Sequence, residues 1–290
     1  MRLRTLPLSL AGVILGLGLA TAVSPMRPAV AAITLLTAAL LQILSNLSNE
    51  LGDFLSGTDT DERTGPAYSL QSGTLSPKDF RTAIAVTAVL CCLSGTAMIW
   101  LSFDTLLCTE AVVLLLLGAA AVWAAIRYTL GRNPYGYRGL GDLFVFLFFG
   151  LASVGGTYFV AAHCIIWPML LAAAAIGLFS IGVLNTNNIR DMETDAGTRV
   201  TIPLKIGLRN ARIYQTALIG GGWVFLVLFL LCDFDWWHWL VLVTLPLYAL
   251  HLRGVWRYTG RQLDKMLPLL VMTTFLLSCI LSLTYIILYA

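Results

Sequence analysis

Residues 165–195 read IIWPMLLAAAAIGLFSIGVLNTNNIRDMETD, and this stretch decides the fold. Residues 165–188 carry no charged side chain. They are long enough to cross a bilayer, which takes roughly 20 residues of helix. The apolar run ends in Asn187, Asp191 and Asp195, each four residues after the one before. The stretch therefore predicts a membrane-spanning helix with polar side chains at one of its ends.

The rest of the chain has the same apolar character. Of its 290 residues, 58% are hydrophobic and 11% are charged, whereas a soluble domain has about 25% charged residues. This composition excludes a soluble globule, and it excludes disorder, which requires low hydrophobicity and high net charge. The formal net charge of +3 is too small to indicate nucleic acid, and we expect no nucleic-acid partner. The chain is predicted to be an all-α polytopic membrane protein, surrounded by the lipid bilayer.

Apolar runs of spanning length occur nine times. The predicted spans are residues 7–25, 29–51, 82–102, 108–130, 141–162, 165–188, 211–232, 236–253 and 267–289. Nine spans in a chain of this length leave about a third of the residues for connections, since each span takes roughly 20 residues.

The second and the sixth span end in the same N-x-x-x-D pattern, which indicates a weak internal repeat. We therefore expect one transmembrane domain over residues 1–290, built from two related four-helix sets and a ninth helix. The repeat-like halves would cover about 1–138 and 139–265, and the ninth helix 266–290. Repeats of this kind often place a binding site between them.

Basic residues are distributed unevenly among the connections. Seventeen of the 18 Lys and Arg residues fall at the N-terminus or after even-numbered spans, and Arg27 alone falls on the other side. Because basic loops are retained in the cytoplasm, the N-terminus is predicted to be cytoplasmic and the C-terminus to lie outside a cytoplasmic (inner) membrane. The long polar connections 50–80 and 190–210 then lie on the cytoplasmic face.

We call the polar pattern at the end of the second span the first motif and the one at the end of the sixth span the second motif. The second motif consists of Asn187, Asp191 and Asp195. Their spacing puts one amide and two carboxylates along a single helix face. Hard oxygen ligands of this kind suit Mg²⁺, which is held by one or two carboxylates together with substrate phosphates. A solvated helix end is the alternative, but acids beside an apolar span are costly without a function. We predict all three as Mg²⁺ ligands and the two aspartates as catalytic.

The first motif begins with Asn49 and Asp53, which share a helix face and are predicted metal ligands, with Asp53 also catalytic. The next position on that face is Gly57, which offers no ligand but permits backbone angles with φ above zero. A turn there would swing Asp59 back as a further metal ligand. Asp61 is the competing candidate, although its surroundings favour a surface acid.

Basic residues in the same loops are predicted to bind an anionic substrate. Two acid clusters repel each other unless cations lie between them. An anion clamped by Mg²⁺ and arginine forks is the expected ligand, and diphosphate fits. The candidates are Arg63, Arg132, Arg199 and Lys205. For each of them the alternative is a role in membrane topology alone, because cytoplasmic loops are basic in general.

The paired motifs on nine apolar spans resemble the UbiA superfamily of intramembrane aromatic prenyltransferases, over nearly the whole chain. Several stretches resemble the branch that prenylates 1,4-dihydroxy-2-naphthoate in menaquinone synthesis. These are residues 4–8, 42–47, 57–66 and 133–142. Sister branches usually carry an acid where Gly57 stands.

The resemblance implies transfer of a polyprenyl group from polyprenyl diphosphate to dihydroxynaphthoate, with loss of CO₂ and diphosphate, to give demethylmenaquinol. Mg²⁺ and basic residues, including Arg4, would hold the diphosphate, and the apolar bundle would house the tail and exclude water. Aromatic ring faces can stabilise an allylic cation. The candidates are Tyr128, Tyr135, Tyr137 and Phe54, each with packing or anchoring as the alternative role.

Two other functions are compatible with the pattern. One is prenylation of another aromatic acceptor, such as a hydroxybenzoate or homogentisate. The other is transport of an ion or lipid, which also uses many spans, repeats and intramembrane acids. Transporter sites lie near the bilayer midplane, whereas the acids of this chain lie at the cytoplasmic ends of its spans.

Overall fold

The computed structural model describes residues 3–57, 70, 75–197 and 199–289. In chain order the elements are η1 Leu3–Thr5, α1 Leu6–Ala20, α2 Pro28–Leu55, α3 Pro77–Phe103, α4 Thr109–Arg127, η2 Tyr135–Tyr137, α5 Gly141–Val145, η3 Phe146–Gly156, α6 Thr157–Ala162, α7 Trp167–Arg190, α8 Met192–Asp195, α9 Ile202–Cys232, η4 Trp236–Thr244, α10 Leu245–Arg257, η5 Gly260–Lys265 and α11 Met266–Tyr289. Here η3 is a π-helix, and the other η segments are 3₁₀-helices.

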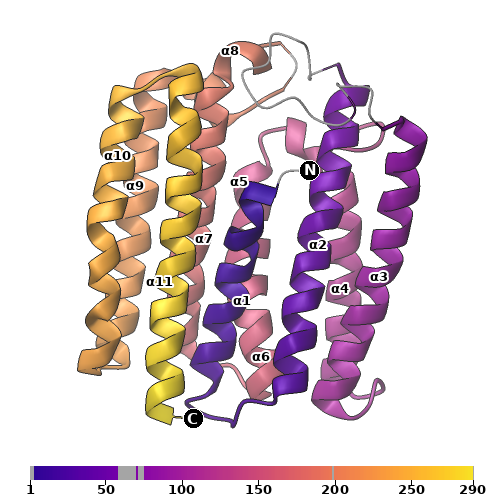
Figure 1. Cartoon of the computed structure of the whole chain (residues 1–290), viewed down its shortest axis with the longest axis vertical. Helices are drawn as coiled ribbons and strands as arrows, with labels where there is room; N and C mark the ends of the chain where they lie inside the picture. The colour runs from indigo at the N-terminus through magenta and orange to yellow at the C-terminus, as the bar shows by residue number, and fades with distance from the viewer. Residues whose placement is uncertain (1–2, 58–69, 71–74, 198, 290) are drawn as a thin grey trace.

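The all-α membrane fold is confirmed. Among the described residues, eight helical segments are long and apolar enough to span a membrane, and the shorter apolar α1 makes nine. The α5, η3 and α6 elements form one continuous span, as do η4 with α10. Figure 1 shows the helices running side by side, with α1 starting toward one end of the bundle and α11 ending at the other, as an odd number of spans requires.

The seventh span differs from its prediction at its start. The expected span begins at residue 211, but α9 begins at Ile202. Thr201 caps the helix by accepting a hydrogen bond from the backbone of Leu204, and Pro203 suits the first turn. A non-helical Gly207 with φ of 80° interrupts the added segment. The hydropathy pattern does not predict this first part of the helix because it precedes the apolar run.

Two main hydrophobic cores hold the bundle together, and a small third cluster consists of Ile189, Ala211, Val255 and Leu263. The smaller core joins α2, α3 and α4 around Leu44, Leu51 and Phe80. The larger core joins α1, η3, α7, α9, α10 and α11, with Phe179 and Tyr248 fully buried in it. Figure 1 shows α2–α4 gathered on one side and α9–α11 on the other, with α1 and α5–α7 between them. The predicted division into repeat-like halves at residue 138 stays a prediction.

The first helix is enclosed by elements from distant parts of the chain. A Cβ on Gly16 would lie 2.5 Å from the Val154 carbonyl oxygen, and one on Gly18 would lie 2.5 Å from Cα of Ser282. Glycine at these positions therefore lets α1 approach both η3 and α11 closely. The Ser282 hydroxyl also donates a hydrogen bond of 2.7 Å to the Ile14 carbonyl.

Candidate active site

A cavity of about 800 Å³ lies between the two cores. At one end its lining includes both polar motifs, through Asn49, Asp53 and Asn187. Its walls elsewhere are mostly apolar and include Met98 and Leu114. A cavity with one polar end and long apolar walls fits a molecule that has a charged head and a hydrocarbon tail.

The first motif is held in place by the end of α4. The Thr129 hydroxyl bonds to the Ser48 carbonyl at 2.9 Å and to the Asn49 carboxamide oxygen at 3.1 Å. A Cβ on Gly52 would lie only 2.6 Å from the Thr129 side chain, so the glycine permits this approach. The helix then ends, and Gly57 adopts a φ of 70°. The predicted turn at Gly57 is confirmed.

Asp53 lies at the centre of the polar end and is fully buried. Its Oδ1 accepts hydrogen bonds of 2.8 Å from the Tyr137 hydroxyl and from Nη2 of Arg199. The Arg199 guanidinium also lies over the Tyr137 ring, 5.0 Å from its centroid. Burial, followed by the negative charge of Asp53, raises the pKa of the Tyr137 phenol. Tyr137 therefore stays a hydrogen-bond donor to this carboxylate.

The second motif is organised by Arg190, the last residue of α7. Its Nε and Nη2 each donate a 2.7 Å hydrogen bond to the Asp191 carboxylate, and Nη2 also reaches Oδ1 of Asn187 at 2.8 Å. Asp191 is 1% exposed and does not line the cavity, whereas Arg190 does. The guanidinium thus lies between this aspartate and the cavity.

Arg199 joins the two motifs. Besides its bond to Asp53, its Nε lies 3.3 Å from Oδ1 of Asp195. Both carboxylates are buried, and the Arg199 side chain is 12% exposed. A single cationic group thereby contacts a carboxylate from each motif. Sequence reasoning predicted that the acid clusters would need a shared positive charge, and here a side chain of the protein supplies one.

A fourth carboxylate connects the two ends of the chain to this site. Asp264, in η5, accepts hydrogen bonds of 2.9 Å from Nη1 of Arg4 and from Nη1 of Arg190. All three residues line the cavity. Next to them, the Gln42 amide donates to the Thr5 hydroxyl at 2.9 Å and to Asn46 at 3.1 Å.

Sequence reasoning missed Arg190 and Asp264. Arg190 stands inside the second motif, where the preference for basic cytoplasmic loops already accounts for its charge. Asp264 lies 74 residues from Arg190 and 260 residues from Arg4. For Arg190 a usable signal was its position beside Asp191, where an arginine can neutralise a buried acid. For Asp264 the sequence held no local signal.

Aromatic rings form one wall of the cavity. Tyr128 and Tyr135 pack edge to face with ring centroids 5.3 Å apart, and Tyr135 stacks on Phe144 at 4.0 Å. Phe148 continues the row at 6.1 Å from Phe144. All four line the cavity, and the Tyr135 hydroxyl donates to the Ala124 carbonyl at 2.7 Å. The predicted Tyr128 and Tyr135 are therefore brought to the cavity.

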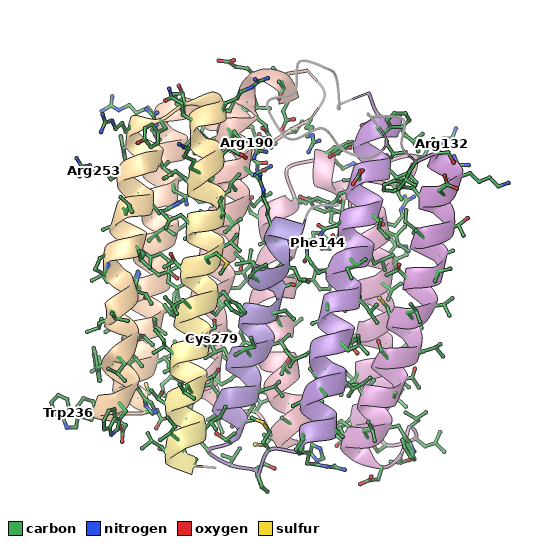
Figure 2. The ribbon with its side chains drawn as sticks, viewed as in Figure 1. Arg132, Phe144, Arg190, Trp236, Arg253 and Cys279 are labelled. Atoms are coloured by element: carbon green, nitrogen blue, oxygen red, sulfur yellow. The ribbon has the colours of Figure 1, made fainter. Side chains whose placement is uncertain are left out.

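Other predicted residues do not meet there. Arg132 is exposed and does not line the cavity, and Figure 2 shows it at the outer edge of the bundle, far from Arg190 and Phe144. Lys205 is also exposed and outside the cavity lining, with its ammonium near Gly139. Asp59, Asp61 and Arg63 lie outside the described residues. The binding roles of these residues stay predictions.

The donor chemistry of the site fits Mg²⁺. Within the described part of the chain, no three His, Cys, Asp or Glu side chains converge on one point. The available donors are instead carboxylate and carboxamide oxygens from both motifs, with Asn49, Asp53 and Asn187 facing the cavity. Mg²⁺ commonly takes one or two carboxylates and completes its shell with water and substrate phosphates. A cation at the position of the Arg199 guanidinium would have a carboxylate of each motif beside it.

Comparison with known proteins supplies independent information. Residues 9–280 match the UbiA prenyltransferase family. The 1,4-dihydroxy-2-naphthoate octaprenyltransferase of Escherichia coli strain K12 is 41% identical over 277 residues, which cover 94% of this chain and 88% of the relative. The proteins of the same name from Haemophilus influenzae and Mycobacterium tuberculosis are each 35% identical, over 93% of this chain and 87% and 88% of their own lengths.

The fold also matches a solved structure. The apo structure of a UbiA homolog from Aeropyrum pernix K1 superposes with a TM-score of 0.74, covering 99% of this chain and 98% of the other. The sequence identity is 18%, so this likeness concerns the fold alone.

Proposed function

The chain belongs to the UbiA prenyltransferase family, and we propose that it prenylates 1,4-dihydroxy-2-naphthoate. It transfers a polyprenyl group from polyprenyl diphosphate, releases diphosphate and CO₂, and yields demethylmenaquinol for menaquinone biosynthesis. The names of the relatives at 35–41% identity support this acceptor. The observation that carries the reaction type is the contact of Arg199 with Asp53 and Asp195 at the polar end of a largely apolar cavity.

Mg²⁺ is the proposed cofactor. Asn49, Asp53 and Asn187 would hold it from the cavity lining, and Asp191, Asp195 and Asp59 are the further candidate ligands. When bound, it neutralises charge that develops on the leaving diphosphate. Arg190 and Arg199 are placed to donate charge-assisted hydrogen bonds to phosphate oxygens. Both line the cavity and both are held by carboxylates, so their guanidinium groups are oriented before substrate binds.

The apolar part of the cavity has two tasks. It accommodates the polyprenyl tail, and it excludes the water that would otherwise quench an allylic cation. The row of rings from Tyr128 to Phe148 offers aromatic faces along the same wall. A positive charge that develops at C1 of the prenyl group is stabilised when it faces such a ring.

The acceptor is tested with purified protein, labelled prenyl diphosphate and a panel of aromatic compounds. Labelled demethylmenaquinol is expected from 1,4-dihydroxy-2-naphthoate, with much less product from 4-hydroxybenzoate or homogentisate. Chelation of divalent metal should stop the reaction, and added Mg²⁺ should restore it. Equal or faster prenylation of hydroxybenzoate would contradict the proposed acceptor, and full activity in excess chelator would contradict the cofactor.

The active site is proposed to face the cytoplasm across a cytoplasmic (inner) membrane, because the basic residues gather at that end. A cysteine-free background carrying Glu193→Cys or Leu107→Cys tests this orientation, since both positions are exposed at opposite ends of the bundle. In intact cells freed of any outer membrane, a membrane-impermeant maleimide should label the cysteine at 107 and leave that at 193 unlabelled. The reverse pattern would invert the topology.

A further inference from the structure

The segment between α4 and α5 is fixed against the polar end of the cavity. The backbone N–H of Val200, next to Arg199, donates a 3.0 Å hydrogen bond to the Tyr137 carbonyl. Helix α5 starts at Gly141, and its first turn brings Asp142 to the cavity wall. The segment that presents Tyr137 to Asp53 therefore also presents a further carboxylate to the same cavity.

Asp142 differs from the motif aspartates in its partners. Asp53, Asp191 and Asp195 each contact an arginine. In the parts of the chain that the structure describes, Asp142 forms no ion pair and its Oδ1 has no hydrogen-bond partner. Its Oδ2 accepts a 2.7 Å hydrogen bond from the Tyr214 hydroxyl of α9.

The position of Asp142 beside the aromatic wall indicates what it meets. Phe144 follows Asp142 by two residues in α5 and stacks on Tyr135, and all three residues line the same cavity. Gly141 lets Tyr128 approach the start of α5 closely, since a Cβ there would lie 3.0 Å from the Tyr128 hydroxyl. A flat aromatic molecule lying on these rings can direct a hydroxyl group toward Asp142. An acid at the edge of a span without a cationic partner is costly, which favours a functional role.

We propose that Asp142 is the catalytic base that accepts the proton of the acceptor's ring hydroxyl, and this inference rests on the proposed function. The proton moves from the hydroxyl next to the carboxylate-bearing carbon to Oδ1 of Asp142. The ring electrons form the new bond from that carbon to C1 of the prenyl group, and the C1–oxygen bond breaks with its electron pair leaving on diphosphate. The carbon–carboxylate bond then breaks, CO₂ departs, and the ring oxygen takes the proton back from Asp142.

Asp142→Asn is the first test, with transfer to 1,4-dihydroxy-2-naphthoate as the readout. A lost general base is expected to lower kcat about a hundredfold to a thousandfold. KM for the prenyl diphosphate should stay unchanged. Tyr214→Phe keeps the carboxylate and should cost much less, and Glu110→Gln, at an exposed site on α4, is the matched control. A kcat for Asp142→Asn close to that of the wild type would overturn the proposal.

A second acceptor separates catalysis from folding. A ring-halogenated dihydroxynaphthoate has a more acidic hydroxyl and depends less on a base. The deficit of Asp142→Asn should shrink with this acceptor, measured as the rate ratio of the two acceptors on the same preparation. A partly misfolded sample lowers both rates alike, so an unchanged ratio would overturn the base assignment. If the wild type itself does not prenylate either acceptor, the proposed function fails instead.

Discussion

Replacing Asp53 by asparagine is expected to lower prenyl transfer about a thousandfold, in line with the loss of one electrostatic group aimed at a developing charge. Asp53 is the fully buried carboxylate at the polar end of the cavity and contacts both Tyr137 and Arg199. Asparagine keeps its size and one acceptor oxygen but removes the charge that a divalent cation requires. The loss should therefore appear in kcat, together with a raised Mg²⁺ requirement.

The measurement is turnover of labelled prenyl diphosphate over a range of Mg²⁺ concentrations. Asp104→Asn is the matched control, because this acid is largely exposed beyond the end of α3. It should leave turnover unchanged. Elution of both variants as the same species in detergent shows whether the fold is intact. Turnover of Asp53→Asn close to wild type, in intact protein, would remove this residue from the catalytic set.

Replacing Arg199 by methionine is expected to damage both activity and stability. The change leaves Asp53 and Asp195 buried without the guanidinium that they share. Removing one partner of a buried ion pair costs about 3–5 kcal/mol of folding stability, because the remaining charge is uncompensated. Loss of a phosphate-binding fork should also reduce turnover by about a thousandfold. Turnover and thermal unfolding in detergent are the two measurements.

Arg253→Met is the control for this prediction, since Arg253 is exposed and does not line the cavity. Arg199→Lys keeps the charge but cannot contact both carboxylates with a planar fork. Its activity should therefore fall between that of Arg199→Met and that of the control. Combining Asp53→Asn with Arg199→Met should cost less stability than the two single changes added, because the pair is coupled. Strict additivity would mean that the contact contributes nothing.

The sequence predicts the helices, and the polar motifs at their ends, well because both depend on local information. Length and hydropathy define a span such as 165–188 without reference to other helices. Four-residue spacing places Asn187 and Asp191 at one helix end, and a glycine at position 57 predicts a turn. Each of these inferences uses only neighbours along the chain.

The partners of the polar residues are harder to predict because they come from distant elements. Nothing near Arg4 or Arg190 indicates that both contact Asp264. Arg132 and Arg199 look equivalent in sequence, since cytoplasmic loops are basic in general. Only packing distinguishes the arginine that joins the two motifs from the one that stays at the surface. The same reason hides Asp142 and its partner Tyr214, which belong to different helices.

The enclosure of α1 has a consequence for biosynthesis. This helix is made before α2–α10, yet its partner Ser282 belongs to α11, which is made after them. Arg4, just before α1, likewise pairs with an acid that precedes α11. During translation α1 therefore stays in the lipid without these partners until the intervening helices have been inserted. Completion of the polar end depends on the arrival of α11, so chains that stall before its synthesis would be membrane-inserted and inactive.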